Sequence, residues 1–159
     1  MTGDRRDGVV VCVLVCDRDD AASAALLIRS LRDFGGGLSA SEVWVMFPSE
    51  GEGELGAVLR EDLDAAQLEE IRAIELEVES DVARYPFGRK TAACAQAESL
   101  AGGRYRTLIW MAPQCLVTGE PDLLALKESA GASFRAVHVR NIGSPSSSEP
   151  DAFWQAVYS

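Results

Sequence analysis

The segment VVVCVLVC, residues 9–16, decides the fold class of this chain. It is an uninterrupted apolar run rich in valine, which is typical of a strand that is buried on both faces. Such strands occur in parallel sheets that helices cover. We therefore expect residues 9–16 to form the central strand of a parallel sheet.

Helical and strand patterns alternate along the rest of the chain. Apolar spacing predicts helices over residues 21–34, 55–73 and 89–100, and a Gly-Gly-Gly run at 35–37 ends the first. Strands are expected over 42–47, 74–78 and 107–111, with a second apolar piece at 115–117. The third strand alternates apolar and acidic residues, which favours a place nearer the edge. A short helix from Glu120, a strand over 134–139 and a last helix over 151–158 complete the prediction.

This alternation predicts an α/β fold, a three-layer α/β/α sandwich with a mostly parallel, Rossmann-like sheet. The length of 159 residues fits one domain over residues 1–159. We expect residues 1–8 to be disordered and the Ser- and Pro-rich stretch 143–150 to be a mobile loop. Ligands of such sheets bind outside the carboxyl ends of the strands, so residues 16–20, 48–51 and 112–114 are the places to look for function.

Charge and cysteine usage exclude several classes of partner. The formal net charge of −10 disfavours nucleic acid and anionic membrane surfaces as partners. The four cysteines form no CxxC pair and have no histidine cluster beside them, so we expect free thiols in a reducing compartment. The apolar run at residues 9–15 is too short to span a bilayer and lacks a cleavage site, and a cytoplasmic location is predicted.

Several familiar motifs are absent from the sequence. The first strand leads into CDRDD, residues 16–20, where a dinucleotide-binding fold carries GxGxxG, and neither a P-loop nor a GxSxG elbow occurs. The one histidine, His138, alternates within a strand pattern, and we interpret it as a core or edge-strand imidazole.

The acidic cluster after the first strand has two interpretations. Asp17-x-Asp19 loosely resembles the opening motif of haloacid-dehalogenase-type phosphatases, with Asp17 as nucleophile and Mg²⁺ held by the carboxylates. The simpler interpretation is that Asp19 or Asp20 caps the following helix.

From Ser30 onward the chain resembles a GT-A-type glycosyltransferase, the nucleotide-diphospho-sugar transferase family. The resemblance rests on the order of SLRDFGGGLS (30–39), VWVMFP (43–48), YPFGRKTAACAQAE (85–98), LIWMAPQCLVTGEP (108–121), VHVRNIGS (137–144) and DAFWQAVY (151–158). It implies a sugar-nucleotide cleft. It also implies acceptor-binding machinery after the fourth strand, for which residues 115–159 are short, so we expect that machinery to be absent or supplied by another chain.

The chain departs from this family at the metal site. Where the resemblance implies Asp-x-Asp, this sequence has Ala112-Pro113-Gln114, which supplies no carboxylate to Mn²⁺ or Mg²⁺. We therefore expect no metal cofactor, unless Asp17 and Asp19 act as ligands. Arg89 and Lys90 are candidates to neutralise a diphosphate instead, or are simply solvent-exposed charges. The predicted substrate-binding residues are Cys16, Asp17, Arg18, Asp19, Arg89, Lys90, Ala112 and Gln114.

The leading hypothesis from sequence is a degenerate transferase-like domain that binds a nucleotide or nucleotide sugar. The alternatives are an active metal-independent glycosyltransferase, a Mg²⁺-dependent phosphatase using Asp17 and Asp19, and a non-catalytic interaction module. Tyr85 and Phe87 either stack on a base or sugar or pack their loop onto the sheet. Trp154 and Tyr158 predict a homodimer patch or a surface for a partner chain.

Overall fold

The computed structural model describes residues 8–49, 53–65, 69–85, 87–121 and 124. The chain divides into two compact units, Met1–Ala125 and Leu126–Ser159, and every described residue belongs to the first. The elements predicted over residues 134–139 and 151–158 lie outside the described residues, as do most of residues 1–8 and all of 143–150. A single domain over residues 1–159 thus stays a prediction.

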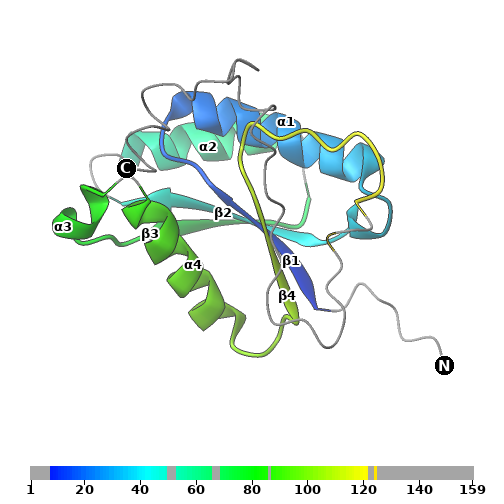
Figure 1. Ribbon diagram of the computed structural model, residues 1–159. Helices are drawn as coiled ribbons and strands as arrows, with labels where there is room; N and C mark the ends of the chain where they lie inside the picture. Colours follow the sequence, from blue (N-terminus) through cyan, green and yellow to red (C-terminus); the bar gives the residue numbers. More distant parts are fainter. Residues whose placement is uncertain (1–7, 50–52, 66–68, 86, 122–123, 125–159) are drawn as a thin grey trace, which may run out of the picture. The chain divides into compact units, whose positions relative to one another are not determined.

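Four parallel strands form one sheet in the first unit (Figure 1). Its strand order is β3-β2-β1-β4, which confirms the predicted α/β fold with a parallel sheet. The elements are β1 (Val9–Leu14), α1 (Arg18–Phe34), η1 (Gly36–Leu38), β2 (Glu42–Pro48), α2 (Gly53–Ala65), β3 (Ile71–Leu76), α3 (Ser80–Ala83), α4 (Gly88–Ala101) and β4 (Thr107–Met111).

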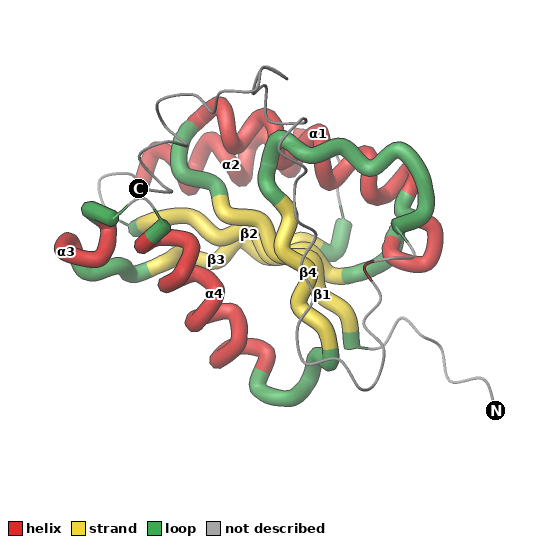
Figure 2. The backbone as a smooth tube through the Cα atoms, viewed as in Figure 1, coloured by secondary structure: helices red, strands yellow, loops and turns green. Residues whose placement is uncertain are grey.

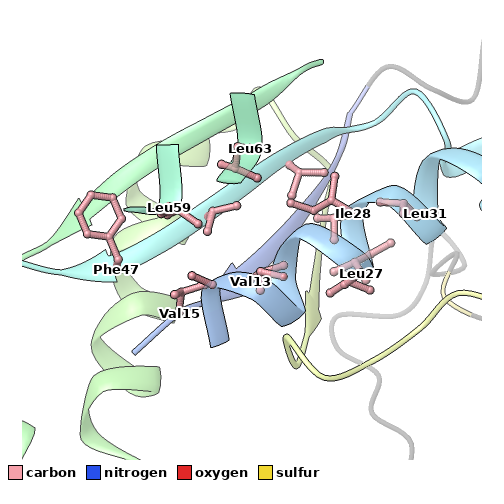
Figure 3. Close-up of a cluster of buried hydrophobic side chains, with 14 of the residues drawn as sticks. Val13, Val15, Leu27, Ile28, Leu31, Phe47, Leu59 and Leu63 are labelled. Atoms are coloured by element: carbon pink, nitrogen blue, oxygen red, sulfur yellow. The ribbon is translucent and has the colours of Figure 1, made fainter. Parts of the chain in front are cut away.

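The apolar run at residues 9–16 contributes buried side chains to both faces of the sheet. Val11, Val13 and Val15 lie in one hydrophobic cluster with residues of α1 and α2 (Figure 3). Val10 and Cys12, which point the other way, lie in a second cluster with α4. Because successive side chains of a strand alternate between faces, covering both faces requires the uninterrupted apolar run that the sequence shows.

The first three strands are added to the sheet in one direction, and the fourth is added on the opposite side of β1. The path β1-α1-β2-α2-β3 moves outward with both long helices on one face, and α4 then returns along the other face to place β4 beside β1 (Figure 2). This makes the β1/β4 junction the topological switch point, where open α/β sheets bind ligands. The complete three-layer sandwich stays a prediction, because further elements fall outside the described residues.

The predicted boundary between the second helix and the third strand is wrong. The helix predicted over residues 55–73 ends as α2 at Ala65, and the third strand occupies Ile71–Leu76 instead of 74–78. The backbone before β3 turns through Glu70, which has a φ of 55°, a left-handed conformation that interrupts regular structure. The strand β3 is the edge of the described sheet next to β2, as its alternating pattern indicates.

Other sequence expectations also need correction. The apolar piece at residues 115–117 forms neither a helix nor a strand, and Phe34, the last residue in the apolar spacing of the predicted helix over 21–34, is 55% exposed. Within the part of the chain that the structure describes, no helix combines the length and apolar character needed to cross a bilayer.

The connection after β4 runs across α1 and is held at two places (Figure 1). Val117 is buried, and its N–H donates to Ser30 Oγ at an N–O distance of 2.9 Å. Further on, the N–H of Gly37 donates to Glu120 Oε1, also at 2.9 Å. Gly36, with a φ of 54°, lies so close that an added Cβ would meet Glu120 Cδ at 2.4 Å. The left-handed backbone favours glycine here, whereas the contact itself is with a flexible side chain that could move aside.

Candidate functional site: a pocket at the switch point

A pocket of about 420 Å³ lies at the carboxyl ends of β1 and β4. It is formed by the end of β1 and the first turn of α1, by the end of β4, by the α3–α4 connection and by the start of α4. Its described lining residues are Leu14, Cys16, Asp20, Ala83, Arg84, Tyr85, Phe87, Arg89, Lys90, Trp110, Met111, Ala112, Pro113 and Gln114. The pocket is thus placed where the strand order predicts a ligand.

The acidic cluster after β1 caps α1. Asp17 is the N-cap residue, and its Oδ1 accepts a hydrogen bond from the N–H of Asp20 at 2.8 Å. Asp20 in turn accepts from the N–H of Cys16 through Oδ2 at 3.0 Å. The arrangement resembles a capping box, except that Asp20 accepts from the residue before the N-cap, and it satisfies two backbone donors at the helix start. The prediction that Asp19 or Asp20 is the cap is therefore wrong, because the helix begins at Arg18 rather than Ala21.

Asp20 also joins the two strand ends that flank the switch point. Its second carboxylate oxygen, Oδ1, accepts a hydrogen bond from Gln114 Nε2. One carboxylate therefore bridges the backbone that follows β1 and the side chain that follows β4. Each oxygen of the Asp20 carboxylate thus accepts a hydrogen bond, and the two bonds connect the segments that follow β1 and β4.

Arg89 reaches the end of β1 from the first turn of α4. Partial burial, assisted by the negative charge of Asp20, raises the pKa of the Cys16 thiol, while the charge of Arg89 and its hydrogen bond to the thiol oppose that rise. The net effect is a raised pKa, so Cys16 stays protonated near neutral pH. Cys16 therefore brings Arg89 to the end of β1 as a neutral hydrogen-bond partner.

Positive charge gathers in the pocket although the chain as a whole is acidic. Arg84, Arg89 and Lys90 line it, and Asp20 is the one acidic residue among its described lining residues. Arg84 is 3.7 Å from Asp81, but both side chains are largely exposed, so that ion pair is weak. No side chain caps the N-terminus of α4, whose first N–H groups add further positive potential. An anionic group fits this wall of the pocket.

Two aromatic rings stand at the mouth of the pocket. Tyr85 and Phe87 both line it, and their side chains are 72% and 76% exposed. They therefore do not pack their loop onto the sheet, which was one of the two interpretations of the sequence. Exposure at these levels leaves the ring faces accessible to a ligand.

Gly88, the first residue of α4, lies in close contact with α3. A Cβ on Gly88 would lie 1.8 Å from the carbonyl oxygen of Val82 in α3. We expect Gly88→Ala to reduce the free energy of unfolding by about 1–3 kcal/mol, because the backbone must move to relieve that overlap. The displaced turn would also misplace Arg89. Urea unfolding measures the loss.

Gly119→Ala is the matched control for this substitution. An added Cβ at Gly119 meets no atom within 4 Å. Its free energy of unfolding should stay within about 0.5 kcal/mol of the parent chain. Equal stability of the Gly88 and Gly119 variants would contradict the close contact between α3 and α4.

The structure brings together five of the predicted site residues and leaves three outside. Cys16, Arg89, Lys90, Ala112 and Gln114 line the pocket, whereas Asp17, Arg18 and Asp19 are exposed in the first turn of α1 and are not among its lining residues. The region 48–51 also contributes no described lining residue. Arg84 and Asp20 were missed as site residues; for Asp20 the spacing Asp17-x-x-Asp20, typical of a capping pair, was the available signal.

The carboxylates near the pocket do not form a metal-binding group. Among the described residues, no group of three or more His, Cys, Asp or Glu side chains could hold a metal ion. The Asp17 carboxylate accepts from the Asp20 N–H, and Gln114 donates to Asp20. These contacts give the Asp17 carboxylate and the Gln114 Nε2 group structural partners at the start of α1.

Fold and pocket together define an α/β protein with a parallel, Rossmann-like sheet and a basic pocket at its switch point. No protein-family model and no curated protein matches the chain. The resemblance to GT-A glycosyltransferases therefore stays a prediction from the sequence.

Proposed function

We propose that this chain binds a nucleotide or nucleotide sugar in the switch-point pocket, with the phosphate groups against Arg89 and Lys90. The observation that carries the proposal is the gathering of Arg84, Arg89 and Lys90 around one pocket in a chain of formal net charge −10. Such a local reversal of potential attracts a small anion even where the overall charge repels polyanions.

The proposed binding is independent of metal. Ala112 and Gln114 stand at the end of β4, where the family resemblance implies metal-binding carboxylates. Alanine has no ligand atom, and Gln114 offers only a neutral amide oxygen, while its Nε2 donates to Asp20. The guanidinium group of half-buried Arg89 and the ammonium group of exposed Lys90 supply the compensating charge instead. We therefore propose a degenerate relative of the sugar-nucleotide transferases that has lost its metal-dependent chemistry.

Metal-independent sugar transfer is a second candidate, favoured by the position of Arg89 and Lys90 in the same pocket. These two cations would stabilise the negative charge on a departing diphosphate. The phosphatase alternative has no such support, since Asp17 caps α1 and neither it nor Asp19 is a described lining residue.

Calorimetry with UDP, GDP, TDP and their sugars tests the proposal. We expect at least one member of the panel to bind in the presence of EDTA, with an affinity that Mn²⁺ changes by less than about threefold, or about 0.7 kcal/mol. Absence of heat with every member, or binding only when Mn²⁺ is present, would contradict it. Turnover of a bound nucleotide sugar in EDTA would select the transferase over the binding protein.

A further inference from the structure

We propose that Tyr85 and Phe87 form a stacking surface for the base of the bound nucleotide. This inference rests on the proposed function and narrows its ligand class. A nucleoside diphosphate, with or without a sugar, would bind well, and a phosphorylated sugar that lacks a base would bind poorly.

The exposure of the two rings is the first support. Aromatic side chains carry a large apolar area and are mostly buried in folded proteins, as Trp44 is at 0% exposure. Tyr85 and Phe87 instead remain 72% and 76% exposed beside an open pocket. A planar ligand group would cover this apolar surface.

The main chain of Tyr85 and that of Phe87 are hydrogen-bonded to the neighbouring helices. The N–H of Tyr85 donates to the carbonyl of Val82 at 3.2 Å, and the N–H of Gly88 donates to the carbonyl of Tyr85 at 2.9 Å. The carbonyl of Phe87 accepts from Thr91 Oγ1 at 3.0 Å. The main-chain groups that carry the two rings are therefore tied to α3 and α4, which reduces the cost of ordering them on ligand binding.

The rings also lie next to the cations in the chain. Phe87 is the N-cap residue of α4 and directly precedes Gly88, Arg89 and Lys90. One short stretch thus presents a flat apolar face followed by positive charge, and the two features line one pocket. A nucleotide has the matching pair, a planar base joined through ribose to an anionic phosphate. Stacking tolerates any base, because every base has a π-face.

A comparison of nucleotide and pyrophosphate binding tests this inference in the 159-residue chain. The probes are UDP, GDP, TDP and inorganic pyrophosphate, which carries the anionic groups without a base. We expect the tightest of the three nucleotides to bind at least about tenfold more tightly than pyrophosphate. The double variant Tyr85→Ala/Phe87→Ala should lose about tenfold or more of that nucleotide affinity and keep its pyrophosphate affinity within about twofold.

Two further variants separate stacking from general effects. Phe34→Ala removes a ring that is 55% exposed on α1 and is not a described lining residue, and it should leave both affinities unchanged. Phe87→Trp keeps an aromatic face and should retain the full nucleotide affinity, whereas Phe87→Leu should show part of the loss seen in the double variant and keep its pyrophosphate affinity. Thermal unfolding of each variant confirms that the fold is intact.

The possible results distinguish a failure of the stacking proposal from a failure of the proposed function. If pyrophosphate binds as tightly as the nucleotides, or the double variant weakens both probes alike, the stacking surface is refuted and the anion site stands. If neither pyrophosphate nor any nucleotide binds, the proposed function falls with it.

Discussion

Replacing Arg89 and Lys90 together by glutamine is expected to weaken nucleotide binding by about 100-fold, or about 2.7 kcal/mol. Both side chains line the pocket, and Arg89 is half-buried against Cys16. Charge-assisted hydrogen bonds to phosphate are among the strong ones, and a partly enclosed site screens them less than open solvent does. Calorimetry with the tightest nucleotide of the UDP, GDP and TDP panel measures the loss.

The control for this variant removes the same charge elsewhere. Arg29 and Arg60 are exposed on α1 and α2 and are not described lining residues of the pocket. Arg29→Gln/Arg60→Gln therefore changes the net charge equally, and it should alter affinity by less than about threefold at moderate salt. Similar losses in the two double variants would mean that overall charge, and not this pocket, governs binding.

Trp44→Ala should reduce the free energy of unfolding by about 3–5 kcal/mol. Trp44 is fully buried in β2, in the cluster between the sheet and α4. Its Nε1–H donates to Glu42 Oε1 at 2.9 Å, and its ring meets Tyr105 edge to face, with centroids 5.3 Å apart. Truncation would leave a cavity and remove one donor of Glu42, whose other oxygen accepts from the Tyr105 hydroxyl. Urea or thermal unfolding followed by circular dichroism gives the value.

Leu26→Ala is the comparison for the tryptophan variant. Leu26 is 61% exposed on α1, so its loss should cost no more than about 0.5 kcal/mol. A Trp44 variant that is as stable as the Leu26 variant would show that β2 does not lie in the interior of the sheet.

The strands with the most uniform patterns could be predicted closely from the sequence. The run at residues 9–16 can be buried only in a sheet covered on both faces, and the fourth strand was predicted with the bounds that β4 has. The boundary between α2 and β3 was missed for a physical reason. Leu68 and Ile71 continue the three-residue spacing of the helix, and no glycine or proline marks the break; the backbone turns instead at Glu70.

The location of the pocket could be predicted, but its internal contacts could not. The rule that ligands bind at the carboxyl ends of strands pointed to Cys16 and to Ala112-Pro113-Gln114, all of which line the pocket. The bond between Asp20 and Gln114 joins residues that are 94 positions apart, and no local pattern indicates it. The exposure of Tyr85 and Phe87 likewise depends on the tertiary arrangement, because their sequence pattern fits a packed loop equally well.

The connection that crosses α1 after β4 is attached to the rest of the fold at two positions. It has no helix or strand between Met111 and Pro121, and its attachments are Val117 at Ser30 and Glu120 at Gly37. Gln114 lies in the chain between the end of β4 and the first of these attachments, Val117. Lengthening or shortening residues 115–119 would therefore pull the amide away from Asp20 or detach Glu120, whereas exchanging side chains at the exposed positions would leave the span intact. The number of residues in this stretch is therefore expected to matter more for the bond between Gln114 and Asp20 than the identity of its exposed side chains.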